Sequence, residues 1–227
     1  MNYKVVIVAA GRGARMGAFT STFNKALLPV RGKPTISYIV EYYPPNVEIV
    51  CALGYRGEQL RDFLEAAYPD RRFRFVTVAN YDGPGSGPGS SLLACKEYLQ
   101  CPFIYASVDT LVAEVIPDPD HNWFGVAEVA DTARFCSVKT NKHELVVQID
   151  DKVKTDNKYA FIGLAGIHDY VVFWRALERD DTLIAGERQV SNGFQALTTV
   201  GLKAAIFHWY DTGTPERYAE SRDAYPH

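Results

Sequence analysis

Short apolar runs and helical patterns alternate along the first half of the chain. A short apolar run predicts a strand, and apolar residues every three or four positions predict a helix. The expected strands span 3–10, 47–53, 74–79 and 103–108, and the expected helices span 35–43, 57–68 and 90–98. Strands that alternate with helices of this length form right-handed crossover units on a parallel sheet. The first half is therefore predicted to have an α/β fold.

The second half has more strand-like segments and fewer helical ones. Strands are expected over 123–129, 137–140, 145–149, 160–168 and 203–209, and helices over 170–177 and 193–200. No repeat, low-complexity tract or long linker separates the two halves. At 227 residues, a single α/β domain over 1–227 is the simplest prediction, with a first half of 1–115 and a β-rich second half of 116–227.

Glycines punctuate the turn that follows the first predicted strand. Gly11, Gly13 and Gly17 permit positive φ and close approach of the backbone. Successive N–H groups in such a turn form a concavity that binds anions. The cations of this stretch are Arg12, Arg15, Lys25, Arg31 and Lys33, with no acidic residue between them. This combination predicts a binding site for a polyanion such as a triphosphate.

A dinucleotide-binding turn begins in the same way, with two glycines spaced as Gly11 and Gly13 are. That type of site needs an acidic residue at the end of the second strand, where residues 51–56 read CALGYR. The third glycine is also one position late, at Gly17. The triphosphate interpretation is therefore the stronger of the two.

Composition limits the class of protein. A net charge of −3 argues against a general binder of nucleic acid or of anionic membranes. No signal peptide and no apolar run of membrane-spanning length are expected. The four cysteines have no C-x-x-C spacing, and Cys51 and Cys95 are predicted to be buried thiols. The five histidines show no metal-ligand spacing. A cytoplasmic protein with reduced thiols is expected.

The opening turn and its surroundings resemble a known family. Residues 9–16 read AAGRGARM, Lys25 follows ten positions after Arg15, and residues 27–30 read LLPV. This pattern is similar to the signature of the sugar-1-phosphate nucleotidyltransferases, although Asn24 stands where that family usually has proline. The resemblance implies the Rossmann-like nucleotide-diphospho-sugar transferase fold, a mixed, mostly parallel sheet flanked by helices. Residues 1–115 would then bind the nucleotide, and residues 116–227 the acceptor.

Two aspartates extend the resemblance to a metal site. Asp109 ends the fourth predicted strand, where the family has an aspartate that holds Mg²⁺, with Val108 in place of the usual glycine. Asp211 lies in a segment, WYDTGTPERY at 209–218, that is similar to the family's closing motif. Mg²⁺ prefers one or two carboxylates together with phosphate oxygens and water. The resemblance therefore implies Mg²⁺ on Asp109 and Asp211, with Arg15 and Lys25 on the triphosphate.

The remaining site residues are also carried over from the family. The nucleotide would contact the opening turn and the glycine-rich loop at 81–92, through Ala9, Ala10, Gly11, Arg12, Gly13, Ser86, Gly87 and Ser90. The acceptor would contact Lys152, Gly166 and Asn192. For Lys152 an exposed surface position, and for Asn192 a helix cap, are equally good interpretations of the sequence alone.

The resemblance implies an enzyme that joins a nucleoside triphosphate to a sugar 1-phosphate and releases pyrophosphate. One alternative is a cytidylyltransferase for a non-sugar phosphate monoester such as phosphocholine, because residues 151–153 depart from the family pattern. A second alternative is a non-catalytic subunit that binds nucleotide sugars, which the retention of both aspartates disfavours. The expected partners are these small molecules, with no nucleic acid and no membrane. A homo-oligomer is compatible with the sequence.

Overall fold

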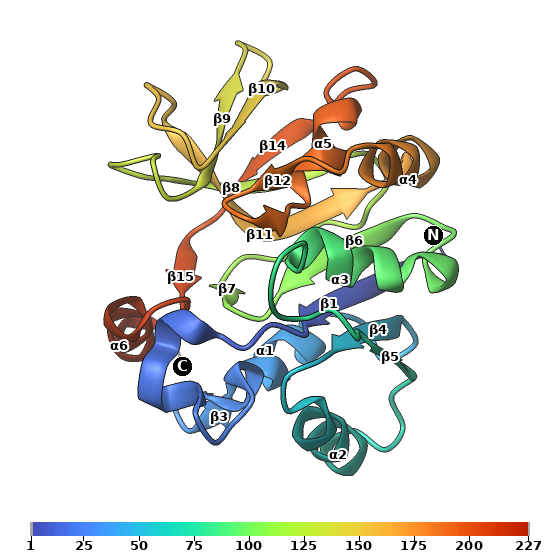
Figure 1. Ribbon diagram of the computed structural model, residues 1–227, viewed down its shortest axis with the longest axis vertical. Helices are drawn as coiled ribbons and strands as arrows, with labels where there is room; N and C mark the ends of the chain where they lie inside the picture. Colours follow the sequence, from blue (N-terminus) through green and yellow to red (C-terminus); the bar gives the residue numbers. More distant parts are fainter. Residues whose placement is uncertain (1, 227) are drawn as a thin grey trace.

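The computed structural model describes residues 2–226, and its central feature is a nine-stranded sheet. The main path of the sheet runs β10-β9-β11-β6-β1-β4-β5, and β8 joins β11 to β14 (Figure 1). The strands of this sheet are β1 (Lys4–Ala9), β4 (Glu48–Leu53), β5 (Phe73–Thr77), β6 (Phe103–Ser107), β8 (Trp123–Glu128), β9 (Cys136–Thr140), β10 (Val146–Asp151), β11 (Tyr159–Ile167) and β14 (Lys203–Ile206).

Smaller elements complete the fold. Three short two-stranded ladders form from β2 (Pro29–Val30) with β3 (Lys33–Pro34), β7 (Thr110–Val112) with β15 (Trp209–Asp211), and β12 (Leu183–Ile184) with β13 (Glu187–Arg188). The α-helices are α1 (Thr35–Glu41), α2 (Gly57–Ala67), α3 (Pro88–Ala94), α4 (Tyr170–Arg179), α5 (Ser191–Leu197) and α6 (Pro215–Ala224). Three 3₁₀ segments are η1 (Ala14–Thr20), η2 (Lys25–Leu27) and η3 (Lys96–Tyr98).

The first-half strands of the main sheet are parallel, as the sequence predicts. β1 pairs in parallel with both β4 and β6, and β4 pairs in parallel with β5. The second half adds β11 to β6 in the antiparallel sense, so strands of both halves share one mixed sheet. The parallel strands end at one edge of the sheet, so the segments that follow β1, β4, β5 and β6 lie along that edge. In open α/β sheets ligands bind at this edge.

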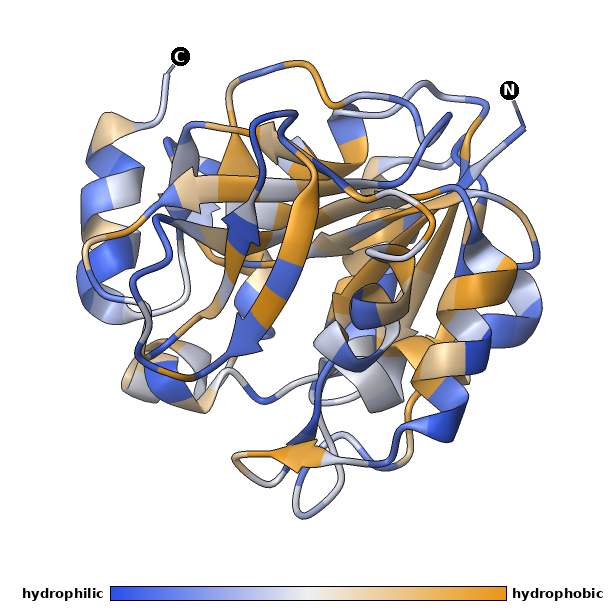
Figure 2. Ribbon diagram, turned by 90° about the horizontal axis from the view of Figure 1, so that it is seen from above, coloured by the Kyte–Doolittle hydropathy of each residue, from blue (hydrophilic) through white to orange (hydrophobic). Residues whose placement is uncertain are grey.

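Apolar side chains fill both faces of this sheet. Val5 and Ile7 of β1 pack in one cluster with residues of α1 and α2, and Val6 packs in the other with residues of α3, α4 and α5. This alternation follows from the two-residue period of a strand. Figure 2 shows the same pattern, with orange strands inside and blue segments on the outer loops and helix faces. Cys51 and Cys95 are buried in these clusters, as predicted.

Several predicted boundaries are wrong. The strand expected over 203–209 is two strands, because the chain leaves β8 after Ile206 and pairs β15 with β7. The helix expected over 90–98 is divided into α3 and η3. The sequence prediction omitted α6, although Thr214 and Pro215 are a strong start signal: the Thr214 hydroxyl accepts the N–H of Arg217 at 3.4 Å.

Between residues 2 and 226, no helix is long and apolar enough to cross a membrane.

Candidate active site

The turn after β1 is the first segment of the candidate site. Gly13 has a φ of 63°, and its carbonyl accepts hydrogen bonds from the Met16 N–H at 2.8 Å and the Thr20 hydroxyl at 3.1 Å. This positive φ favours glycine, and a Cβ on Gly13 would lie 3.1 Å from the Thr20 side chain. The Ala10 carbonyl accepts the N–H of Tyr55 at 2.9 Å, which joins this turn to the segment after β4.

Lys25 is the buried cation of the site. Only 9% of its side chain is exposed, and its Nζ lies 2.8 Å from Asp109 Oδ2. The preceding residue, Asn24, fixes the local backbone: its amide donates to the carbonyls of Tyr55 at 2.9 Å and Ala9 at 3.4 Å, and its Oδ1 accepts the Ala26 N–H at 3.0 Å. Asn24 therefore ties the start of η2 to the ends of two strands.

Asp109 follows β6 and is surrounded by groups that favour its charged form. Its Oδ1 accepts the Ser107 hydroxyl at 2.6 Å, and its Oδ2 faces Lys25 at 2.8 Å and Arg15 at 3.8 Å. Burial would raise the pKa of Asp109, but the ion pair with Lys25, the Ser107 hydrogen bond and the Arg15 charge hold that pKa well below its usual range. Asp109 is therefore a carboxylate at neutral pH.

Asp211 reaches the same place from the far end of the chain. The antiparallel pairing of β7 with β15 puts Asp211 opposite Thr110, the neighbour of Asp109. The Thr212 N–H also donates to the main-chain carbonyl of Asp109 at 2.9 Å. Burial and the nearby charge of Asp109 raise the pKa of Asp211 above its usual value. In Figure 1, β15 lies beside β7, with α6 next to it.

The two carboxylates suit a hard divalent cation. A Cβ on Gly213 would lie 2.8 Å from Asp211 Oδ1 and 3.5 Å from Asp109 Oδ2, so both oxygens border one small space next to Gly213. Among residues 2–226, no cluster of three or more histidine, cysteine, aspartate or glutamate side chains suited to a metal exists. Two carboxylates completed by water and phosphate are the donor set that Mg²⁺ prefers. The residues present therefore fit Mg²⁺.

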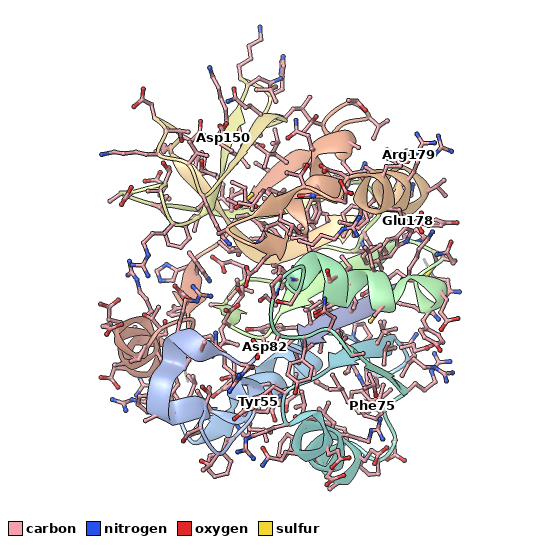
Figure 3. All side chains as sticks on the ribbon, viewed as in Figure 1. Tyr55, Phe75, Asp82, Asp150, Glu178 and Arg179 are labelled. Atoms are coloured by element: carbon pink, nitrogen blue, oxygen red, sulfur yellow. The ribbon has the colours of Figure 1, made fainter. Side chains whose placement is uncertain are left out.

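Arg12 links the opening turn to the loop after β5. Its guanidinium pairs with Asp82 at 2.8 Å and stands over the Tyr55 ring at 5.5 Å. Figure 3 labels Tyr55 and Asp82, which lie close together in the first half of the chain. The pair is exposed, so its net contribution to stability is small. Arg12 therefore connects these two segments at an exposed position.

The glycine-rich loop packs against the second half of the chain. The Gly85 N–H donates to the Gly186 carbonyl at 3.0 Å, and the Arg188 N–H donates to the Ser86 carbonyl at 2.8 Å. A Cβ on Gly87 would lie 2.7 Å from the Arg188 carbonyl oxygen, so only glycine fits there. The Ser90 hydroxyl donates to the Gly85 carbonyl at 2.7 Å. The backbones of this loop and of β13 are therefore in direct contact.

Lys152 and Asn192 lie in the second half of the chain, and both contact other protein groups. Lys152 Nζ is 3.3 Å from Glu187 Oε2, and Glu187 adjoins Gly87 of the glycine-rich loop. The Asn192 amide donates to the carbonyls of Asp180 at 3.3 Å and Thr182 at 3.1 Å. Asn192 thus holds the segment before β12, and within 2–226 no hydrogen bond or ion pair joins either residue to the two aspartates.

Gly166, which the sequence predicts to contact the acceptor, lies toward the other end of β6 from Asp109. It pairs with Ile104 near the start of β6, whereas Asp109 follows the end of that strand. A Cβ on Gly166 would lie 2.1 Å from the Trp123 indole, so this glycine is needed for packing. The glycine of β11 that borders the site is Gly163: its φ is 83°, and a Cβ there would lie 2.8 Å from the Ser107 side chain.

The basic residues that are close in sequence do not form one cluster in the structure. Arg31 donates to the main-chain carbonyl of Tyr225 at 3.2 Å, and Lys33 pairs with Glu41. Neither contacts Asp109, which faces only Arg15 and Lys25 among the described cations. Two surface pockets of about 310 and 410 Å³ contain none of the predicted site residues.

The sequence interpretation missed Ser107 and Gly213. Ser107 stands two positions before Asp109 at the end of a strand, where alternate residues point to the same side. The sequence signal that could have identified Ser107 is a short hydroxyl side chain two positions before a carboxylate. Gly213 lies two positions after Asp211 and donates its N–H to Asp211 Oδ1 at 2.7 Å.

Comparison with known proteins agrees with this architecture. Residues 5–115 match the model of the MobA-like NTP transferase domain. The fold of the whole chain matches a UDP-glucose pyrophosphorylase solved in complex with UDP-glucose, with a TM-score of 0.85 at 20% identity, over 99% of this chain and 98% of the other. Residues 5–115 therefore carry a MobA-like NTP transferase domain, and the whole chain has the fold of the UDP-glucose pyrophosphorylase. The matched range contains the glycine turn and Asp109.

Curated relatives of this chain include larger proteins. The bifunctional protein GlmU of Methanocaldococcus jannaschii is 23% identical over 218 residues, which cover 92% of this chain and 51% of GlmU. The low-salt glycan biosynthesis nucleotidyltransferase Agl11 of Haloferax volcanii is 24% identical over 237 residues, which cover 96% of this chain and 64% of Agl11. The chain spans about half the length of the GlmU relatives that it matches.

Proposed function

We propose that this protein is a nucleotidyltransferase that joins a nucleoside triphosphate to a sugar 1-phosphate, giving a nucleotide sugar and pyrophosphate. The observation that carries the proposal is the convergence of Lys25, Arg15, Asp109 and Asp211 at the edge where the parallel strands end. Two cations and two carboxylates at one place suit a triphosphate with its divalent cation. The match of residues 5–115 to the MobA-like NTP transferase domain supports the same chemistry.

Different residues would bind the two substrates. Residues 9–13 and the loop containing Ser86, Gly87 and Ser90 would hold the nucleotide. Lys25 and Arg15 would bind the phosphates of the triphosphate. Lys152 pairs with Glu187, which adjoins the glycine-rich loop. After release from Glu187, the Lys152 ammonium would bind the acceptor phosphate.

The reaction needs no general base. An oxygen of the acceptor phosphate would attack the α-phosphorus in line, and the bond from that phosphorus to the β-phosphate would break. Pyrophosphate leaves with the electron pair of that bond. The second pKa of a phosphate monoester is about 6, so the acceptor is already mostly dianionic near neutral pH. Catalysis then comes from positioning and from neutralising phosphate charge.

Asp109 and Asp211 would hold the divalent cation, and we infer Mg²⁺. Bound there, Mg²⁺ would neutralise charge on the triphosphate oxygens. The two aspartates orient one another through the backbone, because the Thr212 N–H bonds the Asp109 carbonyl. Ser107 holds one oxygen of Asp109 in place.

A pyrophosphate-release screen tests the proposal. ATP, CTP, GTP, UTP and dTTP are each combined with a panel of sugar 1-phosphates and with phosphocholine, in the presence of Mg²⁺. Release that requires one triphosphate together with a sugar 1-phosphate is expected. Release only with CTP and phosphocholine would favour the cytidylyltransferase alternative. Absence of release in every combination would contradict the proposal and favour a non-catalytic binding subunit.

A further inference from the structure

Both carboxylate oxygens of Asp109 already have partners within the protein. Oδ1 accepts the Ser107 hydroxyl at 2.6 Å, and Oδ2 faces Lys25 Nζ at 2.8 Å. The side chain of Asp109 is 23% exposed, so its access to solvent is limited. A cation that binds Asp109 must therefore displace one of these partners or share an oxygen with it.

Lys25 is the partner that blocks the metal position most strongly. Its ammonium bears a positive charge at the oxygen of Asp109 that borders the space next to Gly213. The side chain is only 9% exposed, and Asn24 fixes the backbone next to it with three side-chain hydrogen bonds. The charge of Lys25 is therefore held at the site and not free to move into solvent.

The charges of the site balance before any ligand arrives. Lys25 and Arg15 offset Asp109 and Asp211, since each residue carries one unit charge when ionised. A divalent cation alone would add two positive charges next to a buried ammonium, and that repulsion is strong where solvent is limited. The negative oxygens of a triphosphate can bind both the divalent cation and the Lys25 ammonium. The arrangement therefore favours simultaneous arrival of the cation and the triphosphate.

We propose that Lys25 keeps Asp109 closed to divalent cations until a triphosphate, arriving in complex with its cation, draws the lysine away. This inference rests on the proposed function. In the free protein Lys25 serves as the counter-ion of Asp109. When the complex binds, the ammonium turns to the phosphates, and Oδ2 of Asp109 becomes available to the cation. One lysine thus has two successive partners in the same site.

Binding of Mn²⁺ without nucleotide tests this role. Mn²⁺ is titrated by electron paramagnetic resonance into the wild type, Lys25→Met, Lys25→Gln and Arg15→Gln, with native folding checked by thermal unfolding. We expect either Lys25 variant to bind Mn²⁺ at least tenfold more tightly than the wild type. Arg15→Gln is the matched control: its guanidinium is 3.8 Å away and its side chain is 67% exposed, so a change below threefold is expected. Adding Asp109→Asn to Lys25→Met should abolish the gain.

Equal Mn²⁺ affinity of the wild type and both Lys25 variants would overturn the inference, and so would failure of all of them to bind Mn²⁺. Two Lys25 variants are included because methionine is apolar and glutamine is polar. If one of them destabilises this buried position, the other still tests the inference. The comparison contains no nucleotide, so it can fail while the wild type still releases pyrophosphate from a triphosphate. Loss of pyrophosphate release in the screen would instead count against the proposed function.

Discussion

The main-chain N–H of Thr212 donates to the main-chain carbonyl of Asp109 at 2.9 Å, although the two residues come from opposite halves of the chain. This bond continues the contact that β7 and β15 begin, where Asp211 stands opposite Thr110. The spacing of the two carboxylates is therefore set by backbone pairing rather than by flexible side chains. Such preorganisation is what a site for a charged transition state requires.

Gly89→Ala should destabilise the protein. A Cβ on Gly89 would lie 2.7 Å from the Gln189 carbonyl oxygen, so the glycine-rich loop and the segment after β13 must move apart. Overpacking of this kind costs about 1–3 kcal/mol. Chemical denaturation measures the loss in the free energy of unfolding. Gly11→Ala is the control, because no atom lies within 4 Å of that Cβ position, and its stability should remain close to that of the wild type.

Gly166→Ala should destabilise the protein by disturbing core packing, and it should leave the affinity for the acceptor unchanged. The added methyl group would collide with the Trp123 indole at 2.1 Å, far from the end of β6 where the site lies. The expected loss is about 1–3 kcal/mol in the free energy of unfolding. Thermal unfolding and the KM for the acceptor are measured on the same preparation. A raised KM with unchanged stability would instead support a contact between Gly166 and the acceptor.

Asn24→Ala should lower both stability and turnover. The substitution removes three side-chain hydrogen bonds and leaves the Ala9 and Tyr55 carbonyls without their amide donor, at a cost of about 2 kcal/mol. Because Asn24 positions Lys25, kcat should fall in the wild-type background and change little in a Lys25→Met background. The loss of stability should be the same in both backgrounds. An equal fall of kcat in both would show that Asn24 does not act through Lys25.

The buried thiols should resist alkylation. Burial raises the pKa of Cys95 to about 12, and burial together with the nearby Cys95 raises the pKa of Cys51 still further. A raised pKa lowers the thiolate fraction, so at pH 8 only about one Cys95 thiol in ten thousand is ionised. Iodoacetamide followed by mass spectrometry should label these two cysteines only after denaturation. Labelling of either in the native protein within minutes would contradict their placement in the core.

The sequence predicts the first half of this fold well because its signals are local. Each parallel strand is a short apolar run, and the residue after it, as with Gly11 or Asp109, lies at the ligand edge by topology alone. The burial of Cys51 and Cys95 follows from the same runs. Asp109 therefore stands out as a candidate site residue from its position in the sequence alone.

The rest depends on contacts between distant segments, which a local pattern does not contain. β15 separates from β14 because it pairs with β7, about a hundred residues earlier in the chain. The choice between Gly163 and Gly166 depends on the register of β11 against β6, and both glycines lie in the same strand. Asp211 is identified only through the resemblance of its motif, because its neighbours in the sequence alone would predict a turn residue.

Pyrophosphate release by Asp109→Ala is the most direct test of the central claim. The claim requires that Asp109 be part of the reacting site, so the variant should lose several kcal/mol of transition-state stabilisation, a fall in kcat/KM of about 10³-fold or more. Arg31→Gln is the matched control, because Arg31 lies in the same basic stretch of sequence but contacts the C-terminal segment instead. Its turnover should stay within about threefold of the wild type. Normal pyrophosphate release by a folded Asp109→Ala variant would contradict the account.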